Sequence, residues 1–458
     1  MGRHVCLAAV CAALLGAVAV PDARAQSSTG DAREVALGGV DYAGRILADS
    51  SGPPSPGFVV PLGLLQLLKD RDALRIGSDR FDPSLVLEYS AVPTHWVIGR
   101  RPSLPRARFI DDIRGAHLSP DLNVYRGFKP AATLDGGGRL SPAFGKTFTV
   151  RRTRRVTHQA FAGAGPYLTI QTKGLFDERL VGLLGASSPG YLPDAALRIG
   201  NQSTGQAAAQ FTGGYRAQLA VGPPGGNSHI EFFADYNYLR GFRYEDVDID
   251  LRIATDARGL VAFDSPDASR LAIDRITSTS GSGLSVDLAV TAVFDRWRVA
   301  VRADGVGNHL DWRKAWQREY EMAQLGGGSD SLRTIAAGGA GDVRVTVPVE
   351  LRLQGAYRDQ SWGAVVELED GFQGATGSAG LERRFASLEL RGGARLVHEV
   401  VLPSAGVSLR AGPVWIDIGA AVTMANLEQQ RNIIAATSLR FGFGGAKPVA
   451  TEAQAAKP

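Results

Sequence analysis

Apolar and polar residues alternate along much of the chain with a period of two. The clearest case is the fifteen-residue run Val343–Tyr357, where valine and leucine hold most odd positions and polar residues hold most even ones. A β-strand directs successive side chains to opposite faces, so the run predicts one apolar and one charged face. Globular strands average about five or six residues, whereas about 9–11 tilted residues cross a bilayer. The run therefore predicts one strand of a transmembrane barrel.

Comparable runs recur from about residue 144 onward and predict further strands of the same kind. Short connections such as Asp295-Arg296 separate some of them, and longer polar stretches such as 326–330 separate others. Short turns at one end and long loops at the other are typical of outer-membrane barrels. We therefore predict an all-β, transmembrane antiparallel β-barrel of about 14 strands, within a range of about 12 to 16. The clearest runs cover residues 211–221, 230–238, 247–253, 284–294, 297–303, 362–368, 388–396, 414–422 and 433–443.

The N-terminus has the three parts of a secretory signal peptide. Arg3 and His4 form a basic start, residues 5–20 are almost wholly apolar, and the small-residue motif Ala23-Arg24-Ala25 follows. We predict cleavage after Ala25, so that residues 1–25 are removed. Together with the barrel pattern, this export signal predicts a bacterial outer-membrane protein.

The remaining chain divides into three predicted parts. Residues 26–80 are irregular, and the apolar spacing from Leu62 to Leu68 behind Pro61 predicts a short helix. The helix either packs on the body of the protein, plugs the lumen or binds a partner. Residues 81–443 form the barrel, and the Ala-rich residues 444–458 form a disordered tail.

Composition excludes several functional classes. The formal net charge of +4 is too small an excess to indicate nucleic-acid binding. Cys6 and Cys11 are the only cysteines, and both lie in the predicted signal peptide, so the mature chain has no thiols. The histidines are isolated, and neither a P-loop nor a nucleophile motif is present. We expect no enzyme activity, no metal site and no cofactor.

Four residues of one alternating run are a candidate ligand site. Asp246, Asp248, Asp250 and Arg252 share a face of the predicted strand 247–253 and its flank. The plain interpretation is a hydrated lumen wall with a local arginine pair. The alternative is a site inside the barrel that attracts cations.

A group of arginines is a second candidate. Arg151, Arg152, Arg154 and Arg155 stand close together. Guanidinium groups bind phosphate through paired hydrogen bonds, so these residues are candidates for contact with lipopolysaccharide or another anion. A solvated loop without a specific ligand is the alternative.

Five segments have the alternating pattern of barrel hairpins: 232–246, 283–295, 305–312, 380–393 and 403–421. They resemble the FadL-type superfamily of outer-membrane barrels, which includes long-chain fatty-acid transporters and TraF-like and PorV-like proteins. The resemblance implies a 14-stranded barrel whose N-terminal residues plug the lumen and whose hydrophobic substrates pass through a lateral opening. The Asn-Pro-Ala segment typical of the fatty-acid transporters is absent.

The predicted function is passive transport of a hydrophobic or amphipathic small molecule across the outer membrane. The alternatives are a non-transport component of a secretion or conjugation system, and a general diffusion porin. The expected partners are outer-membrane lipid, lipopolysaccharide, the barrel assembly machinery and the small molecule itself. A secreted β-sandwich or solenoid, whose strands also alternate, is the main alternative fold.

Overall fold

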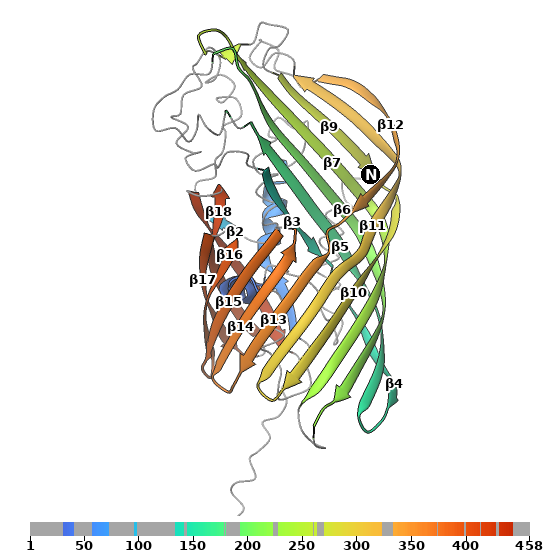
Figure 1. Cartoon of the computed structure of the whole chain (residues 1–458), viewed down its shortest axis with the longest axis vertical. Helices are drawn as coiled ribbons and strands as arrows, with labels where there is room; N and C mark the ends of the chain where they lie inside the picture. Colours follow the sequence, from blue (N-terminus) through green and yellow to red (C-terminus); the bar gives the residue numbers. More distant parts are fainter. Residues whose placement is uncertain are drawn as a thin grey trace, which may run out of the picture.

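The computed structural model is dominated by one antiparallel sheet of 19 strands that curves into a barrel (Figure 1). The structure describes residues 31–40, 57–72, 96–98 and 133–442, with gaps at 142–143, 178, 180–192, 223–227, 260, 263–269, 323–332, 373, 398–399, 413 and 427–429. The predicted signal peptide, the tail 444–458 and the loop at 326–330 lie outside these residues.

The sheet contains long and short strands, and little helix accompanies it. The helical elements are α2 (Ala32–Ala36), η1 (Leu62–Leu64) and α4 (Leu65–Lys69), and the last two coincide with the predicted short helix. Among the described residues, no helix has the length and hydropathy needed to cross a membrane. The strands are β1 (Gly57–Pro61), β2 (Trp96–Ile98), β3 (Thr133–Leu140), β4 (Phe144–Arg152), β5 (Val156–Phe176), β6 (Ala196–Ala220), β7 (His229–Thr255), β8 (Val261–Ala262), β9 (Arg270–Ser278), β10 (Gly281–Phe294), β11 (Trp297–Met322), β12 (Arg333–Thr346), β13 (Glu350–Arg358), β14 (Trp362–Gly371), β15 (Gly374–Arg384), β16 (Leu388–Val397), β17 (Val400–Ala411), β18 (Val414–Asn426) and β19 (Gln430–Gly442).

Neighbouring barrel positions follow the chain closely. From β4 the ladder runs through β5, β6, β7, β10, β11 and β13, and then through each strand in turn to β19. β1 and β2 lie one after the other along the second edge of β19. The strands from β4 to β19 in this ladder occupy thirteen positions around the wall, and β1 and β2 share a fourteenth. This number agrees with the predicted count of about 14. Pairing begins with β1, ahead of the barrel boundary predicted at residue 81.

The barrel wall has two heights. β14, β15 and β16 contain 10 or 11 residues, the length that crosses a bilayer, whereas β6, β7 and β11 contain 25 to 27. In the upper parts of β7 and β11, toward the top of Figure 1, β9 lies between these two strands, and β12 pairs with the other edge of β11. We call β13–β19 the short wall and β5–β12 the tall wall, which rises well beyond the short wall in Figure 1.

Polarity in the short wall is the reverse of that in a water-soluble protein. On β13, Glu350, Arg352 and Gln354 are buried inside, whereas Leu351 and Leu353 are exposed outside. A lipid-facing apolar surface around a polar interior is the pattern of a transmembrane barrel, so the predicted fold class is confirmed. Other exposed apolar residues of this wall are Val366, Leu368, Leu381, Leu390, Leu396, Val401, Leu409, Ile416 and Ile418.

The run Val343–Tyr357, predicted as one strand, is divided between β12 and β13. Both strands pair with β11, but β12 pairs with its upper part and β13 with its lower part. Pro348 lies between them and has no N–H to donate to a ladder. Val345 packs against an internal cluster, whereas Leu351 faces outward, so the apolar face of the run changes sides at the break. The prediction of a single strand was therefore wrong.

Connections at the two ends of the tall wall differ in length. The end that carries the β10–β11 hairpin has compact connections, and we call it the turn end. The opposite end has long ones, and we call it the loop end. Connections at the turn end include 153–155, 221–228, 295–296, 359–361 and 385–387, whereas those at the loop end of the tall wall include 177–195 and 323–332.

Candidate functional site

Two chain segments cross the inside of the barrel, and each brings one buried arginine into it. The first is residues 31–40, which carry Arg33, and the second is β3, which carries Arg139. The barrel interior around these arginines is the candidate functional site, because the buried charges of both walls gather there.

The segment 31–40 lies on the inner face of the short wall. Asp31 caps α2, and its carboxylate accepts a hydrogen bond from the backbone N–H of Arg33 at 3.0 Å. The apolar side of the segment is buried against the wall, with Val35 beside Ile434 of β19. Further along, Leu37 packs with Val365 of β14. These ten residues of the predicted N-terminal segment are thus tied to several strands at once on the inner face, and closure of the lumen by them stays a prediction.

A row of glycines receives the segment. Gly380 lies opposite Gly393 on β15 and β16, and Gly406 lies opposite Gly419 on β17 and β18. A Cβ atom added at Gly393 would lie 2.4 Å from the backbone carbon of Leu37, closer than real Cβ contacts allow. At the other three glycines an added Cβ would also come within 3.0 Å of the segment. The segment therefore packs directly on the strand backbone, and only glycine leaves room for it.

Arg33 lies within a cluster of carboxylates. Glu382, Glu389 and Asp417 are all buried in the wall around it, and each interacts electrostatically with its guanidinium. Two wall arginines share these acids: Arg391 donates to Glu382 at 2.7 Å, and Arg440 lies 3.3 Å from Asp417. We call Asp31, Arg33, Glu382, Glu389, Arg391, Asp417 and Arg440 the Arg33 cluster.

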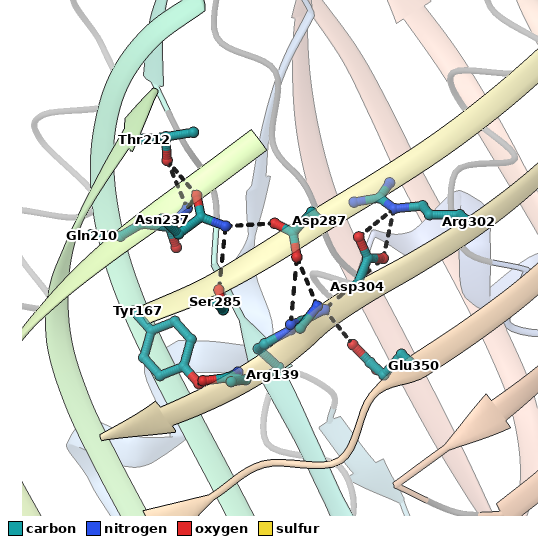
Figure 2. A network of polar contacts seen from close by, with 12 residues as sticks. Arg139, Tyr167, Gln210, Thr212, Asn237, Ser285, Asp287, Arg302, Asp304 and Glu350 are labelled. Atoms are coloured by element: carbon teal, nitrogen blue, oxygen red, sulfur yellow. Dashed lines mark hydrogen bonds and ion pairs between the residues drawn. The ribbon is translucent and has the colours of Figure 1, made fainter. Parts of the chain in front are cut away.

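Arg139 lies among carboxylates of β10, β11 and β13 (Figure 2). β3 pairs with β5, yet a Cβ added at Gly137 would lie 2.9 Å from the ring of Phe372 at the top of the short wall. β3 therefore passes from one wall to the other. The guanidinium of Arg139 donates to Glu350 at 2.7 Å and lies 3.9 Å from both Asp287 and Asp304.

Neighbouring groups complete the charge balance around Arg139. Asp304 lies 2.6 Å from Arg302 and 3.2 Å from Arg352, and Arg352 also donates to Glu350 at 3.1 Å. We call Arg139, Asp287, Arg302, Asp304, Glu350 and Arg352 the Arg139 cluster. Arg352 also lies 3.3 Å from Glu369, which in turn pairs with Arg395 at 3.5 Å. Each charge thus has an opposite charge nearby, which is the condition under which buried charges are tolerated.

An amide network extends from this cluster toward β6. Asn237 donates to Asp287 at 2.7 Å and accepts from Gln210 and Thr212 at 2.9 and 2.7 Å (Figure 2). Each of these groups is buried and has its hydrogen bonds met by another. The network holds the lower tall wall in one arrangement.

An apolar layer follows further along the tall wall. Trp312 is fully buried, stacks on Tyr244 at 5.4 Å and donates its indole N–H to Gln206 at 2.9 Å. Gly241 and Gly281, in register beside it, make room for the indole, since a Cβ at either would lie within 2.7 Å of the ring. The interior thus combines charged and aromatic surfaces. The whole apolar layer is Tyr167, Ala208, Leu239, Tyr244, Leu310 and Trp312.

The predicted acidic site lies on the upper part of β7. Asp246, Asp248 and Asp250 are in register with Thr204, Gln202 and Gly200 of β6, so they share a face as expected. Asp250 pairs with Arg198 at 2.7 Å and with Arg252 at 3.2 Å, and Asp246 accepts from Thr204 at 2.7 Å. Partial burial raises the pKa of Asp246 above its usual value. Cation attraction at this face stays a prediction, and the described residues contain no group of three or more His, Cys, Asp or Glu side chains placed to hold a metal ion.

The predicted arginine site forms the tip of the β4–β5 hairpin. Arg151 and Arg152 end β4, and Arg154 and Arg155 lie in the turn that follows. All four are exposed. The hairpin tip lies at the turn end, as Figure 1 shows for β4.

The sequence did not predict Arg33 or Arg139, the arginines of the two segments inside the barrel. Arg302, Asp304, Glu350 and Arg352 fall on the polar side of alternating runs, so a charged lumen was foreseeable. Arg33 and Arg139 belong to short, irregular stretches in which alternation gives no signal.

Comparisons with known proteins give weak similarities. No family model matches the chain, and no curated protein matches it. Among solved structures, the toluene transporter TodX of Pseudomonas putida aligns with a TM-score of 0.34 and 9% identity, covering 72% of this chain and 96% of TodX. The CymD monoaromatic hydrocarbon channel aligns with a TM-score of 0.28 and 12% identity, covering 70% and 77%. A mutant Rhodopseudomonas blastica porin aligns with a TM-score of 0.21 and 10% identity, covering 62% and 100%. The fold assignment rests on the sheet itself.

Proposed function

We propose that the protein is an outer-membrane channel for passive movement of a small amphipathic molecule, closed at rest by residues 31–40 and β3. The observation that carries this proposal is the reversed polarity of the short wall, with apolar residues outside and paired charges inside. A protein of this construction is stable only where lipid surrounds it. The short turns then face the periplasm, and the tall wall projects outward from the cell.

The interior suggests the class of molecule. Binding sites for small ligands combine apolar and aromatic lining with a few polar groups. The layer around Trp312 supplies the apolar surface, and Gln206 and Asn308 supply hydrogen-bonding groups beside it. A molecule with an apolar body and a polar head fits this combination better than a simple hydrocarbon or a salt ion. The resemblance to FadL-type barrels points the same way.

A non-transport role in a secretion or assembly system is the second candidate. Leu65 and Leu68 of α4 are exposed, at 43% and 37%, and exposed apolar side chains are typical of contacts with other proteins. A general diffusion porin is the third candidate, and it requires an open lumen at rest.

Electrophoresis of the detergent-extracted protein, unboiled and boiled, is the first test. A closed barrel migrates as a compact species until it is heated, and absence of the shift contradicts the membrane placement. Proteoliposomes then separate the candidates. The channel proposal expects uptake of a fluorescent fatty acid without steady ion conductance. Steady conductance favours the porin, whereas neither activity, with a co-purifying protein lost in the Leu65→Asp/Leu68→Asp variant, favours the assembly role.

A further inference from the structure

The tip of the β4–β5 hairpin is the most concentrated unbalanced charge in the described chain. Arg151, Arg152, Arg154 and Arg155 are exposed, and no carboxylate lies within ion-pair distance of them among the described residues. Other arginines at the same end do have acidic neighbours: Arg296 lies 4.0 Å from Asp295, and Arg298 lies 3.3 Å from Glu231. The hairpin arginines therefore present four uncompensated positive charges.

The turn that carries them is well ordered by its own hydrogen bonds. The N–H of Thr153 donates to the carbonyl of Val156 at 2.8 Å, and the N–H of Val156 donates to the Thr153 hydroxyl at 2.9 Å. The carbonyl of Arg155 accepts from the N–H of Ala220 on β6 at 2.7 Å. The arginines are thus held on a fixed backbone, which lowers the entropy cost of binding.

The outer face of the hairpin alternates cations with apolar groups. Phe148 is directly opposite Ala160, which is opposite the outward-facing Tyr215, so Phe148 also faces outward. Phe148 is 49% exposed and Val150 is 70% exposed. The ammonium of Lys146 lies 5.6 Å from the ring of Phe148. Aromatic side chains next to basic ones are typical of the boundary between acyl chains and headgroups.

We propose that this hairpin binds the phosphate groups of anionic phospholipid in the leaflet at the turn end of the barrel. Phe148 and Val150 enter the acyl region. The four arginines lie nearer the hairpin tip and bind headgroup phosphates through paired N–H···O contacts. Basic residues close to an anionic membrane surface each strengthen the attraction to it. The inference rests on the membrane placement proposed above but not on transport. Of the anions predicted from the sequence, lipopolysaccharide belongs to the opposite leaflet.

Native mass spectrometry of the whole purified protein in mixed micelles tests the proposal. Micelles contain either phosphatidylglycerol or phosphatidylcholine at the same mole fraction, and bound lipids are counted. The wild type is expected to retain phosphatidylglycerol preferentially. The variant Arg151→Gln/Arg152→Gln/Arg154→Gln/Arg155→Gln is expected to retain at least about tenfold less of it.

A matched control removes the same charge at the other end. Arg258, Arg313, Arg318 and Arg333 are exposed on the tall wall away from the turn end, and changing all four to Gln is expected to leave lipid retention unchanged. Heat-modifiability checks that both variants form barrels, so failure of the membrane placement is distinguishable from failure of the lipid site. Equal phosphatidylglycerol retention by the wild type and the hairpin variant overturns the proposal. Displacement by inorganic phosphate alone, or preference for lipopolysaccharide, overturns it as well.

Discussion

Arg33 and Arg139 have similar surroundings, but the backbone segments that carry them are attached to the barrel in different ways. Both are buried inside the barrel among carboxylates that belong to its wall. Arg139 belongs to β3, which is joined to β5 by a continuous antiparallel ladder. Arg33 belongs to a segment outside the ladder. Its backbone is held by three serine hydroxyls that reach from the wall: Ser378 to Gly38, Ser404 to Ala36 and Ser438 to Ala32.

Because of this difference, we expect Arg139 to be a fixed part of the barrel and Arg33 to be able to leave its cluster together with residues 31–40. If Arg139 is lost, the acids around it stay buried because the ladder keeps β3 in place. If Arg33 is lost, the segment 31–40 can leave the glycine row and admit water to its acids. Similar electrostatics are therefore expected to have different consequences: the first cluster should stabilise the barrel, and the second should hold residues 31–40 in the position that we propose helps to close the lumen.

The largest expected effect comes from Arg139→Met. Removing one member of a buried charge cluster costs about 3–5 kcal/mol, because the remaining charges lose their compensation. The urea midpoint of barrel unfolding in lipid vesicles should fall sharply, whereas Arg258→Met, an exposed arginine, should leave it unchanged. An unchanged midpoint for Arg139→Met would show that water reaches this cluster and that the comparison fails.

Arg33→Met should leave the barrel midpoint close to that of the wild type and release the segment. A protease specific for glutamate reports this directly, because Glu34 lies in α2 and is partly buried in the docked segment, so undocking should speed cleavage after it. We expect cleavage to accelerate at least about tenfold, which corresponds to about 1.4 kcal/mol of lost docking energy. A fall in the barrel midpoint as large as that for Arg139→Met, without faster cleavage, contradicts the distinction between the two clusters.

The strands of the barrel wall could be predicted from the sequence, but the segments inside the barrel and their contacts could not, for a physical reason. Alternation reports which face of a strand meets lipid, so Leu351 and Glu350 could be assigned to opposite faces without a structure. It does not report where a strand leaves the ladder, and the break at Pro348 was missed for that reason. The function of Gly393 depends on a contact with Leu37, far along the chain, and nothing distinguishes it in sequence among 56 glycines.

Gly393→Val tests the glycine row with a neighbouring control. A side chain at Gly393 meets the backbone of Leu37, whereas the exposed Gly392 has only one atom within 4 Å of an added Cβ, at 4.0 Å. Overpacking costs about 1–3 kcal/mol, so the ratio of docked to undocked segment should fall about 5- to 150-fold. Ion conductance in planar bilayers should rise for Gly393→Val and stay at the wild-type level for Gly392→Val. Equal conductance in the two variants means that the segment does not close the lumen.

Ser378→Ala is expected to have the smallest effect and gives the finest test of the comparison. It removes one hydrogen bond of 2.9 Å to the carbonyl of Gly38 and leaves the charges and the glycine row intact. A single hydrogen bond of this kind contributes about 0.5–1.5 kcal/mol, so cleavage after Glu34 should accelerate about two- to tenfold. Ser387→Ala, in an exposed turn of the same wall, serves as the control and should leave cleavage unchanged. Because the change removes only the Ser378 hydroxyl and leaves the backbone pairing of Ser378 with β14 and β16 intact, the barrel midpoint should not move. A lowered midpoint with unchanged cleavage would mean that residues 31–40 belong to the wall as firmly as β3 does, and the two arginines would then be equivalent.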